Sequence, residues 1–162
     1  MTSPTFAELS ILFPNLNNLK LIEMSNNFDP TAIEESDLRV ANSKLCEKLT
    51  HINRVRYAVK AAESCLQDFE SKYPKDKRPR KAIESAKAWI ANPTEENRKR
   101  CEKAADAAAH SAFSAAYSAY SAATSKSGKY NEAVYKKTLW EHTTYGLELL
   151  QTQQENILLE IA

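Results

Sequence analysis

The sequence predicts an all-α protein: a compact bundle of about five to seven helices around a long Ala/Ser-rich central helix. Residues 94–125 contain neither Gly nor Pro and are rich in alanine, the best helix former, so they are expected to form one uninterrupted helix. Residues 51–73 carry a heptad-like apolar stripe. The chain has only two glycines, too few for the hairpin turns of a sheet protein. We therefore expect a single helical domain over residues 1–162.

Residues 1–29 are predicted to form a less regular N-terminal arm with one or two short helices. A short apolar cluster stops at Pro14, asparagines interrupt the next piece, and residues 25–29 resemble a loop. A strand in this arm is also compatible with the sequence. Asp29-Pro30 then predicts a helix start, because Asp is a favoured N-cap and Pro fits the first helical position. Helices are expected from Pro30 to Thr50.

The stripe over residues 51–73 predicts a helix that packs against another helix. Its members are Ile52, Val55, Val59, Ala62, Leu66, Phe69 and Tyr73. Pro74 ends this helix, and Pro79 marks the start of the next, with Asp76 as a candidate cap. That helix is expected to end near Asn92-Pro93, and Thr94 to cap the long helix.

The long helix has small side chains nearly all round, so packing partners are expected on more than one side. After a turn at residues 125–129, a last helical stretch is predicted from Tyr130 to about Ile161. One face of this stretch holds Val134, Thr138, His142, Tyr145 and Leu149, and it is widened by Trp140, Leu147, Leu150, Ile157 and Ile161. Gly146 predicts a kink or a close helix crossing. Residues 151–162 begin with a polar run and are expected to form a C-terminal extension.

Composition excludes several classes of function. The net charge of +1 gives no global field to attract nucleic acid or an acidic membrane, and no apolar run is long enough to span a bilayer. The N-terminus lacks the pattern of a signal peptide, and three widely spaced cysteines fit reduced thiols, so a cytoplasmic location is expected. No CxxC motif occurs and the histidines are scattered, so neither a metal nor another cofactor is predicted.

The first candidate site is the basic segment, residues 72–81, where six Lys or Arg residues accompany one Asp. In a structural interpretation, Arg78 or Arg80 pairs with Asp76 and orders the turn. In a functional interpretation, the segment binds an anion, because guanidinium groups and helix N-termini suit phosphates and carboxylates. The ligand would be an acidic patch on a toxin or a small phosphorylated molecule. The candidate residues are Asp76, Arg78, Arg80 and Lys81.

A second candidate lies on the long helix, where Asp106, His110 and Ser114 follow one another at intervals of four. The serines and His110 are expected either to pack structurally or to line a polar cleft. An Asp–His pair orients an imidazole in acid–base sites. However, no nucleophile is fixed by spacing, and no Gly-rich phosphate loop, paired carboxylates or HExxH motif occurs, so we predict no enzyme activity.

The basic segment also carries a family resemblance. Asp76-Lys77-Arg78-Pro79-Arg80-Lys81-Ala82-Ile83-Glu84 gives the pattern D-x-R-P-R-x-A-I-E, followed by Trp89 and an Ala-rich stretch that holds Ala109-His110. Over residues 54–125 the chain resembles the immunity proteins of bacterial polymorphic-toxin systems, the Imm-five-like group. The resemblance implies a non-enzymatic binding protein that contacts a cognate toxin or effector.

Two alternatives remain open at the level of the sequence. The first is a helical pocket that binds or sequesters an anionic nucleotide or phosphorylated metabolite, as in a phage counter-defence role. The second is a homo-oligomeric assembly that uses the stripe of residues 52–73 between chains. Nucleic acid is not an expected partner, because the charge is balanced.

Overall fold

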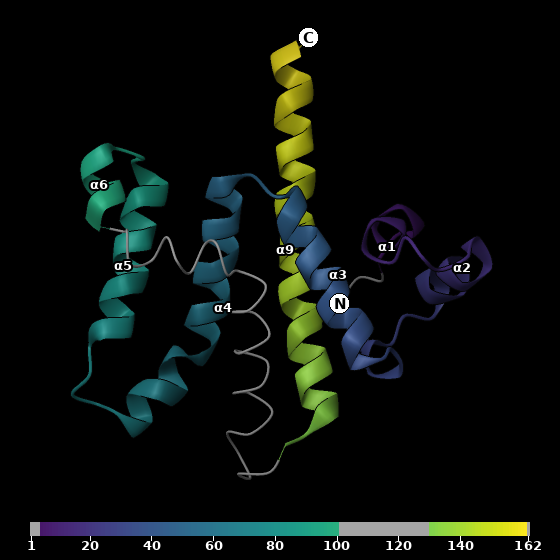
Figure 1. Cartoon of the computed structure of the whole chain (residues 1–162), viewed down its shortest axis with the longest axis horizontal. Helices are drawn as coiled ribbons and strands as arrows, with labels where there is room; N and C mark the ends of the chain where they lie inside the picture. The colour runs from purple at the N-terminus through teal and green to yellow at the C-terminus, as the bar shows by residue number, and fades with distance from the viewer. Residues whose placement is uncertain (1–3, 101–129, 162) are drawn as a thin grey trace.

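The structure is a computed structural model that describes residues 4–100 and 130–161 (Figure 1). These residues form seven α-helices and one 3-10 turn without any strand, which confirms the all-α prediction. The elements are α1 (Phe6–Leu12), α2 (Asn18–Asn26), η1 (Pro30–Ala32), α3 (Glu35–Lys48), α4 (His51–Lys72), α5 (Arg78–Ala91), α6 (Glu95–Arg100) and α9 (Glu132–Ile161).

The predicted helix over residues 94–125 is described only at its start. Thr94 caps α6 as expected: its Oγ1 accepts a hydrogen bond from the backbone N–H of Asn97 at 3.2 Å. Residues 101–125 lie outside the described residues, so a single uninterrupted helix there stays a prediction. Within the ranges that are described, α9 is the central helix, with 30 residues.

Figure 1 shows α9 between two groups of helices. On one side lie α3, α1 and α2; on the other lie α4, α5 and α6. The helices α3 and α4 and the turn η1 pack directly on α9. Gly146 of α9 lies at a close crossing, as the sequence predicted. A Cβ atom added there would lie 2.5 Å from Leu45 Cδ2 of α3 and 2.8 Å from Tyr57 Cε2 of α4.

The buried face of α9 follows the predicted one only in part, with Trp140, Leu147 and Leu150 buried as expected. Val134, expected on the apolar face, is 37% exposed, whereas its neighbour Tyr135 is fully buried. Because α3 and α4 approach α9 from different directions, its buried arc is wide, and spacing alone does not select the face. The buried apolar residues of α9 are Tyr135, Leu139, Trp140, Leu147 and Leu150.

A buried polar junction joins the three central helices. The Asn42 Nδ2 of α3 donates to the Tyr57 hydroxyl of α4 and, at 3.3 Å, to the Thr143 Oγ1 of α9. All three side chains are at most 1% exposed. Burial raises the pKa of the Tyr57 hydroxyl, so this group stays neutral. Buried hydrogen bonds of this kind fix the register in which helices pack.

The N-terminal arm forms both of the predicted short helices. A capping box starts α1: the Thr5 N–H donates to Glu8 Oε2 at 2.7 Å, and the Glu8 N–H donates to Thr5 Oγ1 at 3.3 Å. Leu9 and Leu12 are buried and belong to the main apolar core, and α1 packs on α3. The arm therefore docks on the bundle. By contrast, α2 packs mainly on α1, and Leu21 is its one buried residue.

The stretch from Pro30 to Thr50, where helices are expected, forms two elements, η1 and α3. Asp29 caps as expected, its Oδ1 accepting from the Thr31 N–H at 2.9 Å, but Pro30 opens only the turn η1. Ile33 and Glu34 have extended backbone angles, and α3 begins at Glu35. A second break, at Leu49–Thr50, separates α3 from α4.

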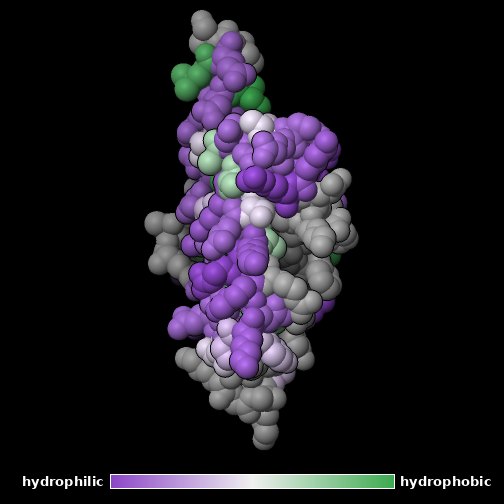
Figure 2. Space-filling model, turned by 90° about the vertical axis from the view of Figure 1, so that its left-hand side faces the viewer, coloured by the Kyte–Doolittle hydropathy of each residue, from purple (hydrophilic) through white to green (hydrophobic). Residues whose placement is uncertain are grey.

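The last turns of α9 extend past the helices that pack on it (Figure 1). There Ile157, Leu158 and Leu159 are 48%, 67% and 76% exposed. Figure 2 shows a hydrophobic patch at this projecting end, above an otherwise largely hydrophilic face on the side of α5 and α6. Residues 151–161 thus continue α9 without a break.

Candidate functional site

The basic segment forms the turn between α4 and α5. The Asp76 N–H donates to the Tyr73 carbonyl at 3.0 Å and closes the turn. Pro79 lies in the first turn of α5, as predicted. Asp76 is not the cap, however, because α5 begins at Arg78 and its N-cap residue is Lys77, which makes no side-chain cap hydrogen bond.

Arg80 binds the last turns of α4. Its Nε donates to Glu70 Oε1 at 2.7 Å and its Nη2 to Glu70 Oε2 at 2.5 Å. This two-pronged geometry is the favoured one for an arginine and a carboxylate. Hydrogen bonding from Arg80 lowers the pKa of Glu70, which therefore stays ionised. The pair joins the end of α4 to the start of α5. The sequence did not predict Glu70 as the partner of Arg80.

Of the other predicted site residues, the structure describes only some. Lys81 is exposed on the first turns of α5, and Lys75 and Lys77 are exposed in the preceding turn. The side chain of Arg78 is not among the described parts of the structure. Asp106, His110 and Ser114 also lie outside the described residues, so their polar cleft stays a prediction.

The apolar stripe of α4 packs against α5, which confirms that it faces another helix. Val55, Val59, Ile83 and Ala86 form a small buried cluster between the two helices. Beside it lies a cavity of about 220 Å³. Among the described residues, those that line it are apolar apart from the Cys65 thiol. Tyr73, the last member of the stripe, is 57% exposed.

His142 is buried between α9 and α4. Its Nε2 lies 3.5 Å from the Ser64 Oγ, but the Ser64 hydroxyl donates to the Ala61 carbonyl at 2.7 Å. Burial, and secondarily the charge of Lys60, lowers the pKa of His142 to about 4. The imidazole is therefore neutral at pH 7. At 3.5 Å, the contact between Ser64 Oγ and His142 Nε2 is longer than the roughly 2.6–3.2 Å between a nucleophile and its base.

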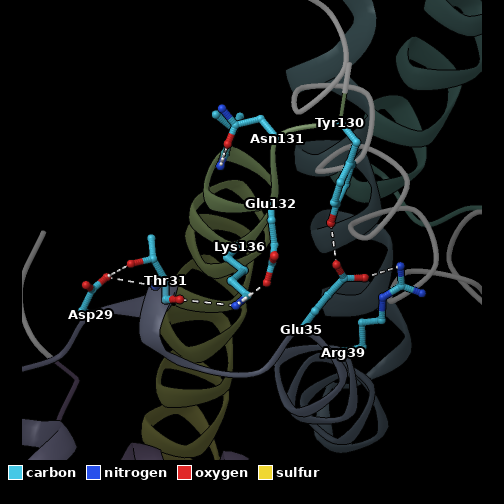
Figure 3. Close-up of polar contacts among 9 residues, drawn as sticks. Asp29, Thr31, Glu35, Arg39, Tyr130, Asn131, Glu132 and Lys136 are labelled. Atoms are coloured by element: carbon cyan, nitrogen blue, oxygen red, sulfur yellow. Dashed lines mark hydrogen bonds and ion pairs between the residues drawn. The ribbon is translucent and has the colours of Figure 1, made fainter. Parts of the chain in front are cut away.

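A further polar cluster lies where η1, α3 and the start of α9 meet (Figure 3). The Tyr130 hydroxyl donates to Glu35 Oε2, and Arg39 Nη2 lies 2.8 Å from Glu35 Oε1. Lys136, only 7% exposed, lies 2.6 Å from Glu132 Oε1 and donates to the Thr31 carbonyl at 3.3 Å. Both cations of this cluster are matched by carboxylates. The cluster therefore holds η1 and α3 on α9 and does not present a cationic site.

Two negative findings apply to residues 4–100 and 130–161. None of their helices has the length and apolar character required to cross a membrane. No three of their His, Cys, Asp or Glu side chains are grouped so as to hold a metal ion.

The comparisons with known proteins assign the family. The family model described as "Imm-5 like putative immunity protein" matches residues 44–130, more than half of the chain. The match runs from the end of α3 through α4, the basic segment, α5 and α6, and so includes the segment on which the resemblance was recognised. No curated protein and no solved structure matches the chain. The chain belongs to the Imm-5 like putative immunity protein family.

Proposed function

We propose that this protein neutralises a cognate toxin by direct, non-catalytic contact, through the surface around the α4–α5 turn. The family match carries the proposal, because it spans both helices and the turn between them. Lys75 and Lys81 are exposed there and offer positive charge to an acidic patch on the toxin, whereas Lys77 Nζ lies 3.8 Å from Glu70 Oε1.

The contacts of the described side chains support binding rather than catalysis. Arg80 is held by Glu70, and the Ser64 Oγ lies 3.5 Å from His142 Nε2, longer than the usual contact between a nucleophile and its base. The cavity between α4 and α5 has an apolar described lining, which suits contact with a protein more than with a phosphorylated metabolite.

The proposal is tested with the toxin encoded beside this chain. Co-expression should restore growth, and the two purified proteins should form a complex in a calorimetric titration. Changing Lys75 and Lys81 together to Ala should weaken the complex about tenfold or more, with the melting temperature nearly unchanged, since each exposed interface charge contributes modestly. The matched control changes Lys48 and Lys99 to Ala, which removes the same charge from exposed sites elsewhere.

Growth restored without any complex would contradict direct contact, and equal weakening by the control would contradict the placement at the turn. Thermal stabilisation by phosphate or a nucleotide panel, without a toxin complex, would instead support an anion-binding pocket.

Arg80 needs a separate control because it also holds the turn together. Arg80→Ala should weaken toxin binding more than it lowers the melting temperature. Glu70→Gln breaks the same pair but leaves the guanidinium in place, so it should spare binding. Equal effects of both changes on binding and melting would show that Arg80 acts only through the architecture of the turn.

A further inference from the structure

A second concave surface lies on the opposite side of α9 from α5. This acidic cleft is formed between the α1–α2 connection, α2, η1 and the start of α3, and has a volume of about 270 Å³. Its apolar lining includes Phe13, Leu16, Met24, Phe28 and Ile33. Phe13 is buried and supports the cleft from within, whereas Leu16 is 36% exposed at its edge.

The charged groups around this apolar lining are mostly acidic. Glu23, Asp29, Glu34 and Asp37 line the cleft with one cation, Lys20, whose Nζ lies 3.1 Å from Glu23 Oε2. Hydrogen bonds from Thr31 lower the pKa of Asp29, which keeps it ionised. Among the residues that the structure describes, the side chains of Glu34 and Asp37 have no hydrogen-bond or ion-pair partner. Lys137 of α9 also acts on Asp29, so the uncompensated negative charge of the cleft comes from Glu34 and Asp37.

The position of two of these acids at the start of α3 has a structural benefit, because carboxylates favour the positive end of a helix dipole. That benefit does not account for the whole arrangement. Asp29 belongs to the segment before η1 and Glu23 to α2, and neither lies in the first turn of α3. Acids from three separate segments therefore surround one apolar surface.

The acidic cleft continues along α3. Phe13, Leu16 and Asp37 also line an adjoining hollow of about 70 Å³, which reaches Val40, itself 50% exposed. The two hollows adjoin one another, because they share these three lining residues.

We propose that the acidic cleft binds a segment of the cognate toxin that presents an apolar side chain between lysines or arginines. The inference rests on the proposed function, which supplies the partner, and adds the chemistry of the toxin surface. An apolar anchor would enter the cleft while the flanking cations pair with Asp29, Glu34 and Asp37. A buried anchor surrounded by complementary charge is the usual arrangement of an energetically dominant contact.

The position of the cleft in the chain indicates its role in toxin recognition. Its lining residues lie between residues 13 and 37, before the matched range of 44–130. The family match therefore does not cover the cleft, whereas it does cover the α4–α5 turn. A contact in this region would give the chain its preference for one toxin over the toxins of other family members.

The first test uses two fluorescent peptides of twelve residues with leucines at helical spacing, one otherwise lysine-rich and one glutamate-rich. The lysine peptide should bind the full-length chain, more weakly as salt is added, and the glutamate peptide should not. Changing Glu34 to Gln and Asp37 to Asn together should weaken binding at least fivefold. Changing Glu47 and Glu141 to Gln, a matched loss of exposed acids elsewhere, should not.

The apolar part of the cleft has its own pair of variants. Leu16→Asn should weaken binding of the lysine peptide, whereas Leu19→Asn should not, because Leu19 is 80% exposed and does not line the cleft. Circular dichroism melts of all variants verify that each is folded. Equal binding of both peptides, or equal losses in variant and control, would overturn the inference.

The toxin itself separates this inference from the proposed function. If the wild type binds the toxin and the Glu34→Gln/Asp37→Asn variant binds it more weakly, both the proposed function and the cleft inference are supported. Equal binding by wild type and this variant would overturn the cleft and leave the proposed function standing. If the wild type does not bind the toxin, the proposed function fails, and the toxin assignment of the cleft fails with it. A dimer in sedimentation that the same variant dissociates would place a second copy in the cleft and would also overturn the inference.

Discussion

At Gly146 the backbone of α9 lies against side chains from two other helices. Gly146→Ala places a methyl group 2.5 Å from Leu45 and 2.8 Å from Tyr57, both buried, so neither neighbour moves freely. Overpacking costs about 1–3 kcal/mol, which should exceed the gain of about 1 kcal/mol in helix propensity. We expect a net loss of stability in urea unfolding.

The control for this prediction is Glu148→Ala, at an exposed position on the same helix. It should change the free energy of unfolding by less than about 0.5 kcal/mol. A more stable Gly146→Ala variant would show that α3 and α4 do not approach α9 as described.

His142 should make the stability depend on pH. Its pKa is about 4 in the folded chain, below the ordinary value of 6.5, so between pH 6.5 and pH 4 the unfolded chain binds more protons. The free energy of unfolding should therefore fall as pH is lowered through this window, by up to roughly 3 kcal/mol from this residue. His142→Gln should flatten the dependence.

His51→Gln serves as the matched control, because His51 is exposed on α4. It should keep the wild-type slope in urea unfolding measured at several pH values. Identical slopes for wild type and His142→Gln would contradict the burial of this imidazole.

Among the elements, the connection between α3 and α4 depends on a side chain far away in the sequence. Gln153 of α9 donates from Nε2 to the Lys48 carbonyl at 3.2 Å, while its Oε1 accepts from the Thr50 N–H at 2.8 Å. The same oxygen accepts from Asn53 Nδ2 at 3.2 Å. One amide thus satisfies backbone groups at the end of α3 and the start of α4, where Thr50 makes no side-chain cap.

Gln153→Ala should lower the free energy of unfolding by about 1–2 kcal/mol, because three hydrogen bonds to this junction are lost. Gln154→Ala, at an exposed neighbouring position, should change it little. Equal effects of the two changes in urea unfolding would show that the junction is stable without this bridge.

Local sequence signals predicted most element boundaries. Asp29-Pro30, Pro79 and Thr94 each begin an element where expected, because capping and proline geometry act within a few residues. The partners of Arg80 and Gln153 were not predicted, because Glu70 and Lys48 meet them only after the helices pack. The same limit applies to α9, whose buried face depends on two partner helices at once.

At the scale of the molecule, the buried apolar residues within 4–100 and 130–161 form two clusters of unequal size. The larger joins α1, α2, α3, α4 and α9, whereas the smaller holds four buried residues between α4 and α5. Of the described elements, α5 packs mainly on α4 and α6. We expect the amides of α5 to exchange with deuterium through local opening, well before those of α3 and the first half of α9.

Native-state hydrogen exchange at rising urea concentration measures this difference. Leu12→Ala, in the larger cluster, should accelerate exchange throughout α3 and α9, since a core Leu→Ala change costs about 2–5 kcal/mol. Ile83→Ala, in the smaller cluster, should act mainly on α5. Equal acceleration of both regions by Ile83→Ala would mean that the two clusters unfold as one unit.

At the scale of the molecule, a site could be predicted from the sequence only where its charged residues are contiguous in the chain. The basic turn was recognised from residues 72–81, because its charges are contiguous in the chain. The acidic cleft was not, because Glu23, Asp29 and Asp37 lie in α2, in the segment before η1 and in α3, and these segments come together only when the helices pack. Predictions on Asp106, His110 and Ser114 concern residues outside the described ranges.

The most direct measurement of the central claim is a calorimetric titration of this chain with the toxin encoded beside it. Direct neutralisation predicts saturable binding at a fixed stoichiometry, weakened by Lys75→Ala/Lys81→Ala and unchanged by Lys48→Ala/Lys99→Ala. The absence of heat and of co-elution at micromolar concentrations of both proteins, while co-expression still restores growth, would contradict it.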